Sequence, residues 1–519
     1  MNLRFPWLAL SASIALAPCA LADIRLPKIL GNHMVLQSGK PATIWGWADP
    51  NEKVSVSIGS KSAATTAGED GKWSVKLELA PTTKPLEMTV TGKNTLKVED
   101  VLVGEVWICS GQSNMEWSLK QSSTAGTDIP AANFPALRHF KVTKTAIDKP
   151  QEDVVGEWAV CTPETAGAFS GVGFYFGREL HTQLGAAVGL VGSNWGGTPA
   201  EAWASRKYME AEASLKPLLE RWDASVSSYD PEKAKAAFEK VKTEWKMKSE
   251  AAKAEGKPAP QQPKPPSAPA TSPGRPANLY NGMIAPLLPM SIRGAIWYQG
   301  ESNVSRAFQY RTLFPLMIRN WRNDFAQGDF PFHFVQIAPF NYARGNPTAD
   351  LTPCAELWDA QLFTLKTVPN TGMAVISDIG NLQDIHPTNK ADVGNRLALW
   401  ALAKDYGKKD LSYSGPIYKN FSVEGDRIKL EFDHAAGLKS RDGKPLTHFV
   451  IAGEDQHFVP AEATIKGNTI VLGNPSVTKP LAARFGWRED AEPNFVNGAG
   501  LPASPFRTDT FKAVTADKF

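Results

Sequence analysis

The sequence predicts a mixed α/β protein built around a mostly parallel sheet with helices on both of its faces. Between residues 101 and 411, apolar runs of strand length alternate with longer amphipathic segments, a pattern typical of strand–helix–strand units. On either side of this region, short β-like runs are separated by turn residues. We therefore expect a central α/β domain between two β-rich regions.

The elements of the α/β region can be placed from their hydrophobic patterns. The expected strands are Leu102–Cys109, Ala187–Gly192, Arg293–Tyr298, Pro331–Ala338 and Gly372–Ser377. The expected helices are Val172–Leu184, Arg306–Phe325, Cys354–Val368 and Ala391–Lys404. Their alternation along the chain is what predicts parallel strands, since each helix can carry the chain back across the sheet.

The chain divides into segments of different character. Residues 23–100 read as an N-terminal β-sandwich domain, residues 101–411 as the α/β domain, and residues 412–519 as a C-terminal β-rich region. Residues 213–276 interrupt the α/β pattern. Their first part is rich in Lys, Glu and Ala, and Pro258–Pro276 holds eight prolines in nineteen residues. We expect this insertion to be helical and then extended, and to lie outside the core.

Residues 1–22 have the pattern of a secretory signal. Arg4 precedes an apolar stretch, and Ala20-Leu21-Ala22 fits a cleavage site, so the mature chain is expected to begin at Asp23. Cys19 suggests a lipoprotein as the alternative, but Pro18 fits that pattern poorly. No other segment has eighteen consecutive apolar residues. We therefore expect a secreted, periplasmic protein with no membrane attachment once the signal is removed.

Composition narrows the choice of partners. The formal net charge of +3 over 519 residues argues against nucleic-acid binding, which usually needs a strong basic patch. The mature chain has three cysteines, Cys109, Cys161 and Cys354, which is too few for a disulfide scaffold in a chain of this size. One disulfide among them is possible and its pairing stays open. Oligomeric state cannot be inferred from the sequence.

Polar, glycine-containing segments follow four of the expected strands. They are Gly111-Gln112-Ser113-Asn114, Ser193–Thr198, Gln299–Asn303, and a last stretch that runs from Asp378 to Pro387. Ligands of open α/β sheets bind outside the carboxyl ends of the strands. One such segment would mean little, but four of them at one edge of a sheet predict an active site there.

The residue types suggest nucleophilic catalysis. Ser113 is the candidate nucleophile, His386 the candidate base that accepts its proton, and Asp384 the candidate acid that orients the imidazole. Backbone N–H groups of Ser113 and of Gly196 or Gly197 could form an oxyanion hole. Other interpretations remain for single residues, because serine and aspartate often cap helices and a Gly-Gly pair often forms a plain tight turn.

Two residues of the third segment are also candidates. The amide of Gln299 could add a third donor to the oxyanion hole, and Glu301 could hydrogen-bond within the site or have a purely structural role. The eight histidines include no HExxH motif and no pair at metal-ligand spacing. This disfavours a metal-dependent mechanism, and we expect no cofactor.

At these residues the sequence resembles the sialate O-acetylesterase family of the SGNH (GDSL-like) hydrolase superfamily. The matching segments are LPKILGNHMVLQ (26–37), GEVWICSGQSNMEW (104–117), NWGGTPAEAW (194–203), LYNGMIAPL (279–287), RGAIWYQGESN (293–303) and DIHPTNKADVGNRLALWAL (384–402). The resemblance spans nearly the whole mature chain apart from the Pro-rich insertion. It implies a flavodoxin-like, three-layer α/β/α domain and a serine esterase that removes O-acetyl groups from sugars without a metal.

The resemblance supports Ser113 as nucleophile and His386 as base, but the sequence departs from the superfamily pattern at the acid. That acid often lies three residues before the histidine, where this chain has Gln383, and the nearest acid is Asp384. Asp378 is the competing candidate, and a Ser–His pair oriented by a backbone carbonyl is a further alternative. The oxyanion asparagine of the superfamily has no obvious counterpart, so Gln299 is its substitute here.

The expected partner is an O-acetylated sugar or oligosaccharide. The family name favours acetylated sialic acid, and acetylated xylan or another polysaccharide is the alternative substrate. A lipid esterase is less favoured, because the short polar segments offer no long apolar groove. A non-catalytic carbohydrate-binding protein is also less favoured, because binding alone needs no nucleophile beside a base.

Overall fold

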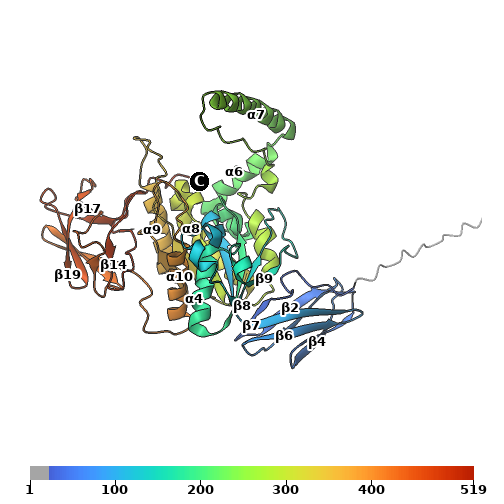
Figure 1. Ribbon diagram of the computed structural model, residues 1–519. Coiled ribbons are helices and arrows are strands. Elements are labelled where there is room, and N and C mark those ends of the chain that lie inside the picture. The colour runs from blue at the N-terminus through green and yellow to red at the C-terminus, as the bar shows by residue number, and fades with distance from the viewer. Residues whose placement is uncertain (1–22) are drawn as a thin grey trace, which may run out of the picture.

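The structure is a computed structural model and describes residues 23–519, so the signal predicted at residues 1–22 lies outside the described residues. Its central sheet has the strand order β13-β12-β11-β7-β10-β8-β9, and neighbours in this order are parallel except β8 and β9 (Figure 1). The strands are β7 (Thr95–Gly111), β8 (Phe134–Lys141), β9 (Trp158–Cys161), β10 (Ala187–Asn194), β11 (Gly294–Tyr298), β12 (Phe332–Gln336) and β13 (Thr371–Val375). The predicted mixed α/β class is confirmed.

Four long helices cover this sheet at the positions that the sequence predicts. They are α4 (Gly171–Leu184), α8 (Ala307–Phe325), α9 (Pro353–Thr367) and α10 (Lys390–Lys404), each within one residue of its expected bounds. Helix α4 packs against α10, and α8 packs against α9. Four shorter helices lie in the connections: α1 (Ser113–Glu116), α2 (Ala125–Asp128), α3 (Pro163–Ala166) and α5 (Arg206–Glu210).

Strands β8 and β9 were not expected from the sequence. The middle of β8 holds Arg138 and His139, two polar residues that break the apolar pattern of a buried strand although both are buried. The guanidinium of Arg138 donates two hydrogen bonds to the carboxylate of Asp100, at 2.6 and 3.2 Å. Because this ion pair satisfies the buried charge, the strand tolerates a residue that hydropathy excludes.

Strand β7 is seventeen residues long and has different partners in its two halves. From Thr95 to Val103 it pairs antiparallel with β6 (Thr82–Thr91). From Gly104 to Gly111 it runs parallel to β10 and, at its end, to β11. The strand runs on past residue 100, where the sequence suggests the end of the N-terminal domain, although its register with β6 shifts there and Asp100 has a φ of +56°.

The remaining strands lie in the two flanking regions. The N-terminal strands are β1 (Val35–Gln37), β2 (Ala42–Trp47), β3 (Lys53–Ile58), β4 (Lys61–Thr66) and β5 (Lys72–Leu77). The C-terminal strands are β14 (Ile417–Glu424), β15 (Arg427–Asp433), β16 (Lys439–Ser440), β17 (Phe449–Ala452), β18 (Val459–Pro460), β19 (Glu462–Lys466), β20 (Thr469–Gly473), β21 (Ala482–Phe485), β22 (Phe495–Val496) and β23 (Phe506–Arg507). In β3 and β5, buried and exposed residues alternate, so one face of each strand packs on a core.

The insertion projects from the body of the molecule. It contains α6 (Lys216–Ser227), which contacts α5 and buries Leu218 and Leu219, and α7 (Pro231–Ala254), which stands apart at the top of Figure 1. Helix α7 has no buried residue, and Asp230 caps its first turn by accepting hydrogen bonds from the N–H groups of Glu232 and Lys233. Contacts between α6 and residues 269–271 hold the two ends of the insertion together.

The described residues also bear on two expectations from the sequence, which concern a disulfide and a membrane span. Cys109, Cys161 and Cys354 are all buried and free, so the disulfide left open by the sequence does not form among them. Within residues 23–519, no helix has the length and apolar character needed to cross a membrane.

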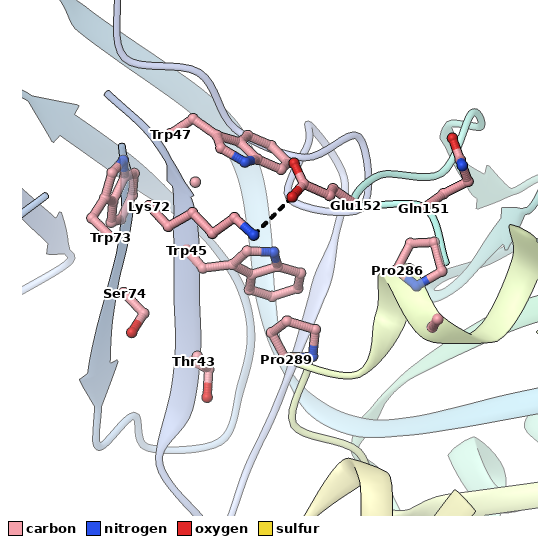
Figure 2. A pocket seen from close by; sticks show the side chains of 12 residues that line it. Thr43, Trp45, Trp47, Lys72, Trp73, Ser74, Gln151, Glu152, Pro286 and Pro289 are labelled. Atoms are coloured by element: carbon pink, nitrogen blue, oxygen red, sulfur yellow. Dashed lines mark ion pairs between the residues drawn. The ribbon is translucent and has the colours of Figure 1, made fainter. Parts of the chain in front are cut away.

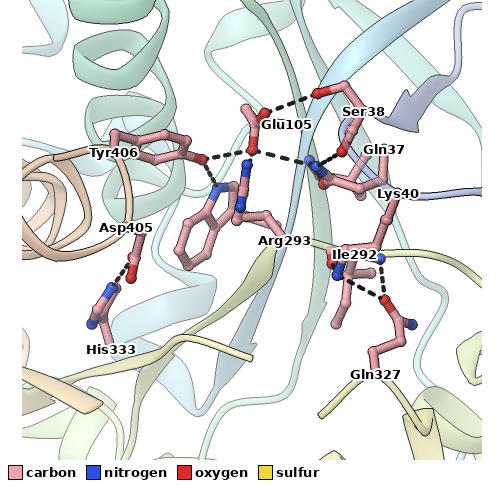
Figure 3. A network of polar contacts seen from close by, with 12 residues as sticks. Gln37, Ser38, Lys40, Glu105, Ile292, Arg293, Gln327, His333, Asp405 and Tyr406 are labelled. Atoms are coloured by element: carbon pink, nitrogen blue, oxygen red, sulfur yellow. Dashed lines mark hydrogen bonds and ion pairs between the residues drawn. The ribbon is translucent and has the colours of Figure 1, made fainter. Parts of the chain in front are cut away.

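A buried carboxylate connects several segments at the middle of β7. Glu105 accepts hydrogen bonds from Arg293 Nε (2.6 Å), Tyr406 Oη (2.8 Å) and Ser38 Oγ (3.0 Å) (Figure 3). Burial by itself raises the pKa of Glu105, but the charge and hydrogen bond of Arg293, with the two hydroxyl donors, hold it below its ordinary value. These donors come from the start of β11, the end of α10 and the segment after β1, so one side chain joins three parts of the fold.

We predict that Glu105→Ala destabilises the protein by about 3 kcal/mol, because it leaves the Arg293 charge partly buried and unpaired. The change should lower the unfolding midpoint at pH 7, measured by tryptophan fluorescence in urea. Since the folded-state pKa of Glu105 is depressed, the wild-type advantage should shrink as pH falls below about 4.3 and through the folded-state value.

Lys97→Ala is the matched control, because Lys97 forms an exposed ion pair with Glu87 in the same region. Its cost should stay below about 1 kcal/mol. Equal costs for the two variants would show that the Glu105 contacts contribute no more than a surface pair.

Candidate active site

Ser113 is the first residue of α1, directly beyond the carboxyl end of β7. The turn depends on Gly111, which has a φ of +130° and lies so close to β11 that a Cβ atom there would sit 2.1 Å from the Tyr298 carbonyl oxygen. Only glycine fits this backbone position. The chain can therefore leave the strand sharply and present the serine at the edge of the sheet.

The structure brings together the three residues that the sequence selected for catalysis. His386 Nε2 lies 2.9 Å from Ser113 Oγ, although the two residues are 273 positions apart. On the other side of the ring, Asp384 Oδ1 lies 3.2 Å from His386 Nδ1, and the same oxygen accepts the backbone N–H of His386 at 2.9 Å. The indole of Trp117 stacks on the imidazole at 4.8 Å between ring centroids. These contacts fix the imidazole between a hydroxyl and a carboxylate.

Asp378, the competing acid, pairs with a different residue and not with His386. Its two carboxylate oxygens accept hydrogen bonds from the guanidinium of Arg396, at 2.6 and 2.8 Å. Asp384 is the acid that contacts His386, and its side chain is 53% exposed, far more than a typical buried triad acid.

The glycine pair lies beside the serine, but its two N–H groups differ. Gly196 is so close that a Cβ atom there would sit 3.1 Å from Ser113 Cβ. Its N–H donates to Glu116 Oε2 at 2.8 Å and is therefore not available to a substrate. In residues 23–519, the N–H groups of Ser113 and Gly197 have no hydrogen-bond partner. Of the three predicted backbone donors, those of Ser113 and Gly197 therefore remain free.

Glu116 was not expected from the sequence to matter. It lies three residues after Ser113, on the same turn of α1, and holds the glycine loop through the Gly196 N–H. Its other oxygen pairs with Lys144 Nζ at 2.6 Å, and that ammonium lies 5.5 Å from the centre of the Trp195 ring. Glu116 therefore ties the serine turn to the loop that follows β10.

Gln299 does not face the serine. Its amide is fully buried, and its nitrogen donates to Asn303 Oδ1 at 2.7 Å and to the Thr198 carbonyl at 3.3 Å. Its oxygen accepts a hydrogen bond from Tyr310 Oη at 3.0 Å. Because both amide hydrogens are already donated, the expectation of a third oxyanion donor at Gln299 disagrees with this geometry. The residue instead supports the end of the glycine loop.

Glu301 lies behind the serine in a buried polar cluster that includes Asn114 and Lys390. The Asn114 amide nitrogen donates to Glu301 Oε1 at 2.5 Å and to the carbonyl of Ile385 at 3.0 Å, and its oxygen accepts from Lys390 Nζ at 2.6 Å. Asn114 follows the serine and Ile385 precedes the histidine. One amide side chain therefore joins the two loops whose 2.9 Å contact defines the site.

Burial shifts the titration of both ionisable members of this cluster. It raises the pKa of Glu301 and lowers the pKa of Lys390 to about 7, although the opposite charges favour ionisation of each other. Hydropathy gives no signal for a fully buried lysine, which is why sequence analysis missed Lys390. Asn114 and Glu116 stand inside the quoted motif, but nothing in the motif indicates their partners.

The arrangement is suited to nucleophilic acyl transfer. A serine hydroxyl contacts an imidazole that a carboxylate orients. In the part of the chain that the structure describes, the N–H of Ser113 itself and that of Gly197, which follows the neighbouring Gly196, have no partner. Within the described residues, no three metal-ligating side chains come together.

We predict a pH-dependent stability difference for Lys390→Met. The folded-state pKa of Lys390, about 7, is lower than the unfolded value of about 10.4, so folding releases a proton between these values. Wild-type stability should therefore rise from pH 7 to pH 9.5 relative to the variant, measured as the difference in urea unfolding midpoint. The exposed-lysine control Lys97→Met should follow the wild type, and a parallel profile for Lys390→Met would contradict the prediction.

Comparisons with known proteins find similar esterases. A family model described as "Carbohydrate esterase, sialic acid-specific acetylesterase" matches residues 272–402, which include His386. A mouse sialate O-acetylesterase is 30% identical over 524 residues, which cover 89% of each chain. The human sialate O-acetylesterase is 28% identical over 534 residues, 93% of this chain and 92% of the human one.

A solved structure is similar over nearly the same length. The crystal structure of a carbohydrate acetylesterase from Xanthomonas citri superposes with a TM-score of 0.79 at 38% identity, covering 94% of this chain and 100% of that one. The resemblance seen in the sequence motifs is confirmed. The chain belongs to the sialate O-acetylesterase family of carbohydrate esterases and is a carboxylic ester hydrolase.

Proposed function

We propose that the protein is a serine esterase that removes O-acetyl groups from carbohydrates through an acetyl-enzyme intermediate. The observation that carries this proposal is the 2.9 Å contact between Ser113 Oγ and His386 Nε2, with Asp384 at the opposite ring nitrogen. A serine hydroxyl needs such a base to become a nucleophile. Membership of a carbohydrate esterase family supports an acetylated sugar as the partner.

The reaction proceeds in two halves. Ser113 Oγ attacks the acetyl carbonyl while His386 takes the hydroxyl proton, and the resulting imidazolium donates that proton to the departing sugar oxygen. Water then attacks the acetyl-serine, His386 accepts a proton from the water, and acetate leaves as the proton returns to Ser113. Asp384 keeps the imidazole oriented and favours its charged form in both halves.

The negative oxygen of each tetrahedral intermediate is stabilised by the N–H groups of Ser113 and Gly197. Of the backbone donors that the sequence selected, these two have no partner within residues 23–519. Removing one such donor typically costs about 2.7–4 kcal/mol of transition-state stabilisation. Gln299 contributes by fixing the Thr198 carbonyl at the end of the loop, and Glu301 by fixing Asn114.

The names of the mammalian relatives favour acetylated sialic acid as substrate. Acetylated xylan or another polysaccharide is the second candidate, since the similar protein of Xanthomonas citri is described as a carbohydrate acetylesterase without a named sugar. Acetate release from acetylated sialic acid and from acetylated xylan, measured side by side with purified protein, distinguishes them. Release from neither substrate would contradict both assignments.

We also propose the three-layer α/β/α arrangement of SGNH hydrolases for the α/β region. Neighbouring side chains of β12 support it, because successive residues of a strand point to opposite faces. His333 contacts Asp405 at the end of α10, whereas the Phe332 and Phe334 rings pack on Phe314 of α8.

The division into residues 23–100, 101–411 and 412–519 stays a proposal, as does secretion. The pattern of residues 1–22 supports export to the periplasm and a mature chain that begins at Asp23.

We predict that Ser113→Ala lowers kcat for 4-nitrophenyl acetate by at least about 10⁴-fold, since it removes the hydroxyl that contacts the base His386. Asp384→Asn should cost about 10²-fold, less than a buried triad acid, because solvent already screens its exposed carboxylate. Initial rates with both variants, after circular dichroism confirms folding, check these values. Full activity of folded Ser113→Ala would refute the mechanism.

We predict that Glu116→Ala lowers kcat by about 10- to 100-fold, because the loop that carries Gly197 loses its attachment to the serine turn. Glu116→Gln keeps an acceptor for the Gly196 N–H and should retain most of the activity. If the charge of Glu116 mattered and its loop contact did not, the two variants would be equally impaired in steady-state kinetics.

A further inference from the structure

The outer face of the β2–β5 ribbon carries an unusual set of side chains. Three cross-strand pairs lie along it: Thr43 with Lys76, Trp45 with Ser74, and Trp47 with Lys72. The alternate residues, such as Ile44 and Val75, point into the core of the N-terminal region. The two tryptophans of the outward face differ: Trp45, at 7% exposure, belongs to the hydrophobic core, whereas Trp47 is only partly buried and keeps ring surface for a ligand.

The two tryptophans face a second wall, which is formed by residues 285–289 and 151–152. Between the two walls lies a cavity of about 430 Å³, lined by Trp45, Trp47, Pro286, Pro289 and Glu152 among others (Figure 2). A neighbouring cavity of about 660 Å³ shares Thr43 and Pro289 with it and continues along Lys76. Because the two cavities share these residues, they form one groove, which we call the ribbon groove.

The polar groups of the ribbon groove suit an uncharged ligand rich in hydroxyls. Lys72 Nζ pairs with Glu152 at 2.7 Å, and the Arg25 guanidinium lies over the Trp47 ring, 4.5 Å from its centre. These charges are engaged within the protein, while further donors and acceptors of the exposed Lys72–Glu152 pair remain for a ligand. The hydroxyls of Thr43 and Ser74 and the amide of Gln151 add further neutral partners. Apolar ring surface beside a few hydrogen-bonding groups is typical of ligand sites, and pyranose rings have the matching pattern of C–H faces and hydroxyl rims.

The groove is connected to the active site by one stretch of chain. Lys144 pairs with Glu116 beside the nucleophile, and Glu152, eight residues later, forms part of the groove. A fully extended segment of that length spans at most about 27 Å. The groove therefore lies no more than about 27 Å from Lys144, which is within the reach of a chain of several sugars.

We propose that the ribbon groove is a binding site for an uncharged pyranose chain, remote from the acetyl group that the enzyme removes. This proposal rests on the proposed carbohydrate esterase function and extends it, since it assigns the enzyme a polymeric or oligomeric substrate. Trp47 and Trp45 provide the apolar wall, and the Lys72–Glu152 pair with Gln151 provides the hydrogen bonds.

The first test measures binding in Ser113→Ala protein, which retains the whole chain and cannot turn over. Titration calorimetry with xylohexaose and with cellohexaose should detect binding of at least one of them. Trp47→Ala and the charge-neutral double variant Lys72→Ala/Glu152→Ala should weaken it at least about tenfold. The double variant keeps the test valid if loss of the indole disturbs folding. Absence of binding, or equal binding by folded variants, overturns the proposal.

The second test compares a polymer with a small ester in the active enzyme. The groove variants should raise KM for acetylated xylan about tenfold more than KM for 4-nitrophenyl acetate, which is too small to reach the groove. Lys97→Ala/Glu87→Ala removes an exposed ion pair of the same N-terminal region and should change neither value. Equal KM ratios for the groove and control variants overturn the proposal. If the wild type hydrolyses neither ester, the proposed function fails. The calorimetric result still decides whether the groove binds a sugar chain.

Discussion

The geometry of the whole molecule depends on one constraint, the change of partners within β7. Its first half pairs with an antiparallel neighbour, and its second half runs parallel to β10 and β11. Glu105 lies directly after this change and collects donors from the segments before β11 and after α10. The buried carboxylate thereby ties β7 to these segments near the point where its pairing with β10 begins, and β7 then runs to its end directly before Ser113.

The site shows how a reactive group is positioned through several weak contacts around it. Three side chains, Asn114, Glu116 and Gln299, each connect two loops at the carboxyl edge of the sheet. Together they join the serine turn, the glycine loop and the histidine loop, which are far apart in sequence. Preorganisation of this kind means that little rearrangement is left for the moment of reaction.

Much of the fold and the core of the site could be predicted from the sequence. Apolar runs located the five strands and four helices because their burial is nearly complete, and the polar strand ends located Ser113, His386 and Asp384. The pattern could not reveal Arg138 in β8 or Lys390 beside the site, because each is a charge made tolerable only by partners distant in sequence. It also could not show that Gln299 points away from the serine, since side-chain direction depends on tertiary packing.

The rest of the molecule depends little on the length of the projecting insertion. Helix α7 buries none of its side chains, and the two ends of the insertion are held together by contacts with α6. For a loop with fixed ends, each doubling of length adds only about 0.6 kcal/mol of closure entropy. During evolution this segment is therefore free to lengthen, shorten or acquire a new module, while the esterase beneath it keeps the same chemistry.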